Sequence, residues 1–177
     1  ALFLTFTGSY GKMNQMTGME GKRAMEQKTA ENRKQVKISV RNLVEFILRS
    51  GDIDNRKAVA PENAMQEGSR IHRMIQRRMG SDYHAEVSLQ YLYETENYRI
   101  LIDGRADGII DATESNGNME TIDEIKGTYR EIHRIKEAQQ VHLAQASCYA
   151  YFYAKQQELS AIRIRITYCN METEELK

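Results

Sequence analysis

Hydrophobic residues recur with two different periods along this chain, and each period predicts a different kind of element. Between residues 62 and 79, apolar side chains collect on one side and arginines mostly on the other, which predicts an amphipathic helix. From residue 87 to 93 hydrophobic side chains alternate, as they do again from 162 to 168, which is typical of half-buried strands. The chain therefore combines helices with strands.

Capping and turn residues complete the predicted order of elements. Ser39 is a favourable N-cap for a helix in which Leu43, Phe46 and Ile47 recur at helical spacing. The string SNGN at 115–118 is a hairpin turn signal. In chain order we expect helices at 39–51 and 62–79, strands at 87–93, 98–110 with a bend near Gly104, and 119–126, a long helix at 133–158, and a strand at 162–168. This ααβββαβ order predicts an α+β fold with a three-strand meander, a crossover helix and a last strand.

The first 36 residues lack a sustained period and are rich in Gly, Met and Lys. We expect them to form an N-terminal arm in front of a domain that spans residues 37–177. Residues 20–35 have the composition of a charged helix, while a flexible solvated arm or an expression remnant are alternatives. We assign no chemistry to this arm.

Composition and charge limit the class of protein. A chain of 177 residues suits one domain with a real core. The 25 Lys and Arg balance the 25 Asp and Glu, which argues against a polycationic nucleic-acid binder but leaves room for a local basic groove. The two cysteines are too few for a disulfide framework, and no apolar run has the roughly 18 residues of a membrane span. We therefore expect a cytoplasmic protein without a membrane segment.

The most informative set of residues is Asp107 together with Glu124 and Lys126. Glu124 and Lys126 are two apart on a predicted strand and so point to the same face, and a hairpin would bring Asp107 beside them. Two carboxylates and a lysine at a strand edge suit a hard cation and the activation of a water. The alternative is a solvated cross-strand set of charges.

Two further features lie on helices. His72 occupies the apolar side of its helix, away from the arginines, and a packed core histidine is the alternative. Gln145 and Tyr149 are four residues apart and share a helix face, an arrangement that is common without any function.

Together the strings GSRIH (68–72), GRADGII (104–110), IDEIKGT (122–128) and QASCY (145–149) resemble the RecB-like branch of the PD-(D/E)xK nuclease superfamily. The resemblance extends from Lys37 to Thr173. It implies a restriction-endonuclease-like αβββαβ core with a mixed central sheet flanked by helices. Residues 38–54 also resemble the start of nuclease-like segments attached to DinG-like bacterial DNA helicases, although the chain contains no Walker A motif.

The resemblance implies a role for each site residue. His72, Asp107, Glu124 and the main-chain carbonyl of Ile125 match the ligands of a Mg²⁺ or Mn²⁺ ion. Lys126 matches the catalytic lysine. Catalytic support, and placement of the DNA strand, would come from the QxxxY pair, Gln145 and Tyr149.

Many nucleases of this branch carry four cysteines that hold an iron–sulfur cluster. Here Cys148 lies inside the QxxxY helix and Cys169 near the last strand, with no N-terminal cysteine partner. We therefore expect no iron–sulfur cluster.

Basic residues flank the proposed acidic centre. Such stretches could hold a phosphate backbone, and a solvated helix face is the alternative. Tyr149 could also stack on a base. The basic residues are Arg70, Arg73, Arg77 and Arg78 on one helix, and Lys126, Arg130, His133, Arg134 and Lys136 after the catalytic strand.

These expectations combine into a metal-dependent DNA nuclease, an exonuclease that acts on single strands or free ends in DNA repair or recombination. A helicase is an expected partner. The alternative is a nuclease-fold module of a helicase or repair complex that binds DNA without cutting it. A plain structural domain with accidental motif matches requires that Asp107, Glu124 and Lys126 do not converge.

Overall fold

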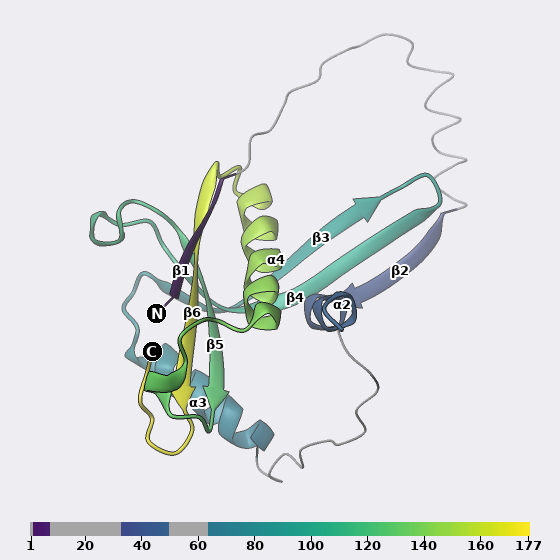
Figure 1. The fold of residues 1–177 in the computed structure, drawn as a ribbon. Helices are drawn as coiled ribbons and strands as arrows, with labels where there is room; N and C mark the ends of the chain where they lie inside the picture. The colour runs from purple at the N-terminus through teal and green to yellow at the C-terminus, as the bar shows by residue number, and fades with distance from the viewer. Residues whose placement is uncertain (1, 8–32, 50–63) are drawn as a thin grey trace, which may run out of the picture.

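The computed structural model describes residues 2–7, 33–49 and 64–177. In these residues a mixed sheet of six strands is flanked by three α-helices (Figure 1). The elements are β1 (Leu2–Thr7), β2 (Lys34–Ser39), α2 (Val40–Ile47), α3 (Ala64–Arg78), β3 (Tyr83–Glu94), β4 (Tyr98–Ile110), the 3₁₀ turns η1 (Glu114–Asn116) and η2 (Ile132–Arg134), β5 (Thr121–Thr128), α4 (Gln140–Gln156) and β6 (Ala161–Asn170). The predicted α+β class and the αβββαβ order are confirmed by α3–β3–β4–β5–α4–β6.

The long strand β4 organises the sheet because it has a different set of neighbours on each edge. One edge pairs antiparallel with β3 along nearly its whole length. The other edge pairs in parallel with β2 at residues 98–103 and antiparallel with β5 at residues 108–110. Beyond β5 the sheet continues through β6 to β1. On this second edge, residues 104–107 of β4 pair with neither strand. They therefore face a gap between the end of β2 and the start of the β5 pairing.

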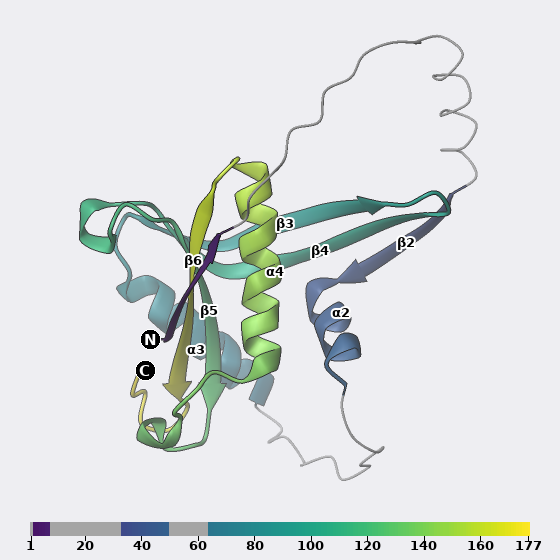
Figure 2. The ribbon, with the colours of Figure 1, turned by 45° about the horizontal axis from the view of Figure 1, so that its top comes forward.

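The two faces of the sheet are covered by different helices. In both views α3 passes behind β5 and β6, whereas α4 stands beside them (Figures 1 and 2). The larger core joins α4 to Ile122 and to alternate residues of β6, while Ile71 and Ile75 of α3 pack on Ile125 from the opposite face. Alternation along β5 thus sends Glu124 and Lys126 toward α4 and Ile125 toward α3.

The helix predicted at Ser39 is present, but its buried face is not the one that its large apolar residues indicate. Ser39 accepts a hydrogen bond from the Asn42 N–H at 3.2 Å, as an N-cap should. Val40 and Val44 are buried, whereas Phe46 and Ile47 are 75% and 65% exposed. Helical period alone does not decide which of two neighbouring apolar stripes meets the rest of the protein, and here the narrower valine stripe does.

Other boundaries also differ from the prediction. The segment predicted as an arm supplies two strands, because residues 2–7 pair with β6 and residues 34–39 pair with β4. Residues 8–32 lie outside the described part of the chain. The long helix begins at residue 140 instead of 133, since residues 132–134 form the turn η2 and Gln139 is extended. Among the helices that the structure describes, none is both long and apolar enough to cross a membrane.

Candidate functional site

Asp107 occupies the gap between β4 and β5. The ladder between these strands ends at the pair Gly108–Asp123, and the Asp107 carboxylate then accepts the Ile125 N–H at 2.7 Å. A side chain therefore takes the place of the next ladder bond. Because the N–H and C=O of one strand residue leave the strand on the same side, the Ile125 carbonyl also faces this gap.

Glu124 is a buried carboxylate beside a lysine. Its Oε1 accepts from the Lys126 ammonium at 2.6 Å, while its buried Oε2 has no hydrogen-bond partner among the residues that the structure describes. Burial and the negative charge of Asp107 raise the pKa of Glu124 to about 7, against the opposing effect of Lys126. A buried carboxylate with an unused oxygen is uncommon unless something else satisfies it.

The neighbouring acid Asp123 belongs to the opposite face and has a structural environment. Its carboxylate accepts two bonds from the Arg165 guanidinium, at 2.9 and 2.7 Å, and one from the Thr167 hydroxyl at 2.6 Å. All of its strongest partners are protein groups. Of the two adjacent acids in the string IDEIK, only Glu124 remains for chemistry.

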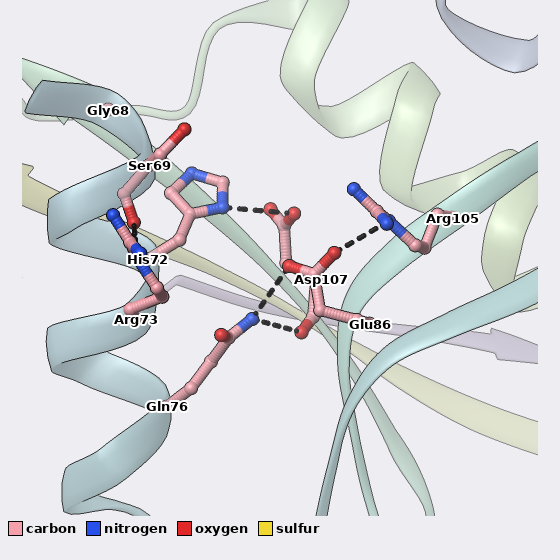
Figure 3. Close-up of a pocket in the computed structure, with 8 residues that line it drawn as sticks. All are labelled: Gly68, Ser69, His72, Arg73, Gln76, Glu86, Arg105 and Asp107. Atoms are coloured by element: carbon pink, nitrogen blue, oxygen red, sulfur yellow. Dashed lines mark hydrogen bonds and ion pairs between the residues drawn. The ribbon is translucent and has the colours of Figure 1, made fainter. Parts of the chain in front are cut away.

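His72 reaches the gap from α3. Its Nδ1 lies 3.2 Å from the Asp107 carboxylate, and the ring points toward that group (Figure 3). Burial alone lowers the pKa of His72, but the bond to Asp107 and the charge of that carboxylate raise it above its ordinary value. The alternative of a packed core histidine is therefore not what the structure shows: His72 is half-buried and faces an acid.

Glu86 joins the same site, although no sequence pattern had singled it out. One ligand atom each from His72, Glu86 and Asp107 lie within 4.8 Å of one another. Glu86 falls opposite Asp107 in the β3–β4 register, at a position left out of the ladder, and has a left-handed backbone with φ 58°. Its carboxylate is held by the Gln76 amide at 3.0 Å and the Arg105 guanidinium at 2.6 Å (Figure 3).

The residues around Asp107 line a cavity of about 800 Å³. Gln76 also donates to the Asp107 carbonyl at 3.0 Å, so one amide holds both the backbone of Asp107 and the side chain of Glu86. Arg73 and Arg105 add positive charge to this wall. The cavity is lined by Gly68, Ser69, His72, Arg73, Gln76, Glu86, Arg105 and Asp107 (Figure 3).

Gln145 and Tyr149 close the gap from the α4 side. The Tyr149 hydroxyl is hydrogen-bonded to the Gln145 side chain and to the backbone of Arg105. Burial, followed by the charge of Glu124, raises the pKa of Tyr149, so the hydroxyl keeps its proton. Tyr149 is only 3% exposed, which leaves no ring face for a base. The predicted stacking role of Tyr149 is wrong, and the residue instead supports the strand.

A methyl group at Gly104 is expected to displace this tyrosine. A Cβ at Gly104 would lie 2.7 Å from the Tyr149 hydroxyl oxygen and 2.8 Å from its Cε1. We expect Gly104→Ala to lower the free energy of unfolding by about 1–3 kcal/mol, measured by urea denaturation. The matched control is Gly68→Ala in α3, where a Cβ meets nothing within 4 Å. Because alanine favours a helix more than glycine does, this substitution should raise the free energy of unfolding by about 0.5–1 kcal/mol. Equal effects of the two substitutions would argue against the contact.

The raised pKa of Glu124 gives a pH dependence of stability with a definite sign. In metal-free protein the folded state holds a proton on Glu124 up to about pH 7, while the unfolded state releases it near the ordinary value of 4.5. Glu124 should therefore lower the free energy of unfolding as pH rises between these values, by up to about 1.4 kcal/mol per pH unit. Urea denaturation from pH 4 to 8 in a chelator should show this slope as a difference between wild type and Glu124→Gln. Parallel curves would contradict it.

The predicted basic residues separate into two groups. Arg73 lines the cavity with Asp107, whereas Arg70 is turned toward Glu67 and Glu174, at 3.0 and 2.6 Å. Two carboxylates largely neutralise Arg70, so the structure leaves it little charge for a phosphate. Arg130 and Arg134 lie beyond the end of β5 and line a different pocket. That pocket also includes Gly127, the residue that follows Lys126.

Comparison with known proteins adds a likeness of fold. No protein-family model matches this chain, and no curated protein matches it. A solved structure described as "Crystal structure of SSO0001" matches with a TM-score of 0.51 and 16% sequence identity, over 90% of this chain and 76% of that chain. At this identity the likeness concerns the fold alone. The chain is therefore similar in its arrangement of sheet and helices to a protein of experimentally determined structure.

Proposed function

We propose that this chain is a metal-dependent nuclease that hydrolyses phosphodiester bonds of DNA. The observation that carries the proposal is the gap at residues 104–107, where Asp107 replaces a ladder bond and meets His72 from one face of the sheet and Glu124 and Lys126 from the other. The resemblance of the same residues to the RecB-like branch of the PD-(D/E)xK nucleases supports it. An exonuclease of DNA repair or recombination, working with a helicase in the cytoplasm, is the form of the proposal that the sequence favours.

The donor set fits a hard divalent cation. Carboxylates of Asp107 and Glu86 or Glu124, the Ile125 carbonyl and one imidazole are the ligands that Mg²⁺ and Mn²⁺ accept. The buried Oε2 of Glu124 lacks a protein partner within the described residues, as an oxygen reserved for a cation would. A cation would also offset the repulsion between Asp107 and Glu124 that raises the pKa of Glu124.

The metal ion and the surrounding side chains would have different roles in hydrolysis. A bound Mg²⁺ or Mn²⁺ supplies a water of lowered pKa and neutralises charge at phosphorus. Lys126, held by Glu124, can donate a hydrogen bond to the attacking water or to a phosphate oxygen. Tyr149 and Gln76 hold the backbone on either side of the gap, at Arg105 and Asp107, so that the carboxylate keeps its position.

The proposed function is tested by cleavage of end-labelled linear and circular single-stranded DNA, with Mn²⁺ and with a chelator. We expect Mn²⁺-dependent cleavage. If the enzyme is an exonuclease, it will cleave the linear DNA and leave the circular DNA intact. Cleavage that persists in the chelator would contradict the metal mechanism. If calorimetry shows DNA binding but no Mn²⁺ binding, the chain is instead an accessory DNA-binding module.

A further inference from the structure

A second, smaller pocket begins at the residue that follows Lys126. It has a volume of about 160 Å³ and is largely enclosed between the end of β5, the turn η2 and the start of α4. Drug-sized ligands occupy pockets of about 300–1,000 Å³, so this one suits a single small group. The groups that matter for its chemistry are Thr128, Arg130, Arg134, Lys136 and His142.

The charge of this pocket is positive. Three cations, Arg130, Arg134 and Lys136, line it against one carboxylate, Glu137. Arg134 forms an ion pair with Glu131, which does not line the pocket. In the part of the chain that the structure describes, the side chains of Arg130 and Lys136 have no ion-pair partner. Two cations are therefore free to meet an anion.

His142 adds a neutral hydrogen-bond donor. The Tyr168 hydroxyl accepts the Gln139 N–H at 3.0 Å and is also hydrogen-bonded to Nδ1 of His142, 2.9 Å away. When the hydroxyl donates to Nδ1, the proton of the neutral imidazole lies on Nε2. Burial, and to a smaller extent the charge of Lys126, lower the pKa of His142 to about 4, which keeps the ring neutral. Gly127, which directly follows the proposed catalytic lysine Lys126, also lines the pocket.

We propose that this pocket is a subsite for a phosphate monoester dianion, and that the terminal phosphate of a nucleic-acid strand is its ligand. The second part rests on the proposed nuclease function. A phosphate monoester carries a charge of about −1.5 to −2 at pH 7, more than the single charge of an internal phosphodiester, and so suits two unpaired cations better. A monoester also continues into the strand on one side only, which an enclosed pocket allows.

The consequence is a rule for where a strand is cut. A terminal phosphate held in this pocket, whose wall begins at the residue after Lys126, would direct the following phosphodiesters toward Lys126 and the gap that contains Asp107. The cleaved bond would then lie at a fixed number of nucleotides from the phosphorylated end of the strand, and the products would be short.

The subsite is tested by binding under conditions that do not depend on cleavage. Fluorescence anisotropy in a chelator compares four labelled oligonucleotides of one sequence, with a 5′-phosphate, 5′-hydroxyl, 3′-phosphate or 3′-hydroxyl end, and inorganic phosphate as competitor. We expect one phosphorylated end to bind at least tenfold more tightly than its hydroxyl counterpart. The double variant Arg130→Gln, Lys136→Gln should remove this preference, and the control Lys34→Gln, an exposed cation at the start of β2, should keep it.

The outcomes separate this proposal from the proposed function. Equal binding of all four ends would overturn the strand-end assignment. If inorganic phosphate still binds, and its binding is lost in the double variant, the ligand is a free phosphate. If neither phosphate nor a phosphorylated end binds, the subsite is absent, even where Mn²⁺-dependent cleavage is observed. Since the three residues exchanged, Arg130, Lys136 and Lys34, are exposed cations, circular dichroism should show an unchanged fold in every variant.

Discussion

Replacing Asp107 by Asn is expected to lower the rate of Mn²⁺-dependent DNA cleavage at least about a thousandfold. The Asp107 carboxylate lies in the gap of the sheet, 3.2 Å from His72 and hydrogen-bonded to the Ile125 N–H. A catalytic cation contributes several kcal/mol of charge stabilisation, and each 1.36 kcal/mol is about a factor of ten in rate. Asparagine keeps an oxygen that can accept the Ile125 N–H, so the loss should come from the missing charge and not from unfolding.

The measurement is a cleavage rate on end-labelled DNA over a range of Mn²⁺ concentrations, together with Mn²⁺ titration by calorimetry. Asp103→Asn is a matched control, because Asp103 lies on the same strand but pairs with Lys37 and is outside the gap. We expect Asp103→Asn to cleave like wild type, and Asp107→Asn to lose metal binding together with activity. Wild-type cleavage by Asp107→Asn would refute the proposed mechanism.

Replacing Lys126 by Met is expected to slow cleavage by about 10²–10⁴-fold, the usual contribution of a positioned proton-transfer or hydrogen-bonding group. The Lys126 ammonium lies 2.6 Å from Glu124 and is only partly exposed. Methionine keeps much of the side-chain length and removes the charge. In contrast to Asp107→Asn, this variant should still bind Mn²⁺, since Lys126 is not a ligand.

The two variants are distinguished by kcat and by calorimetry at pH 8. Loss of the ammonium also removes the partner that lowers the pKa of Glu124, so the cation should bind Lys126→Met more weakly at pH 6 than at pH 8. Lys34→Met is the control for the loss of a lysine elsewhere on the surface. A Lys126→Met variant with unchanged kcat would remove Lys126 from the mechanism.

Much of the fold was predictable because its elements carry local signals. The N-cap at Ser39, the alternation in β3 and β6 and the turn at 115–118 each depend on residues close together in sequence. The connection between β4 and β5 does turn there, through η1 followed by the left-handed residues Gly117, with φ 74°, and Asn118, with φ 52°. Elements whose partners are distant in sequence were missed, and β1 is the clearest case: its pairing with β6 joins residues about 160 positions apart.

The residues of the candidate site also fall into those that the sequence pattern identified and those that only the structure identified. Asp107, Glu124 and Lys126 were found from strand spacing, and the structure brings them together with His72. Glu86 was missed, because only the β3–β4 register places it opposite Asp107. His142 was missed as well, because its burial, the charge of Lys126 that lowers its pKa and its hydrogen bond to Tyr168 all come from other elements.

The sequence by itself determined the kinds of elements, their order and the small set of residues that we propose bind a cation and a phosphate. Periodicity and capping are local, and a short chemical motif is complete within one strand or helix. Only the tertiary structure decided that β2 and β5 share one edge of β4 and leave a gap at residues 104–107. It also decided which acid of IDEIK faces that gap and which is buried against Arg165. These choices depend on strand register and on the packing of opposite faces, which join residues far apart in the chain and have no local signature.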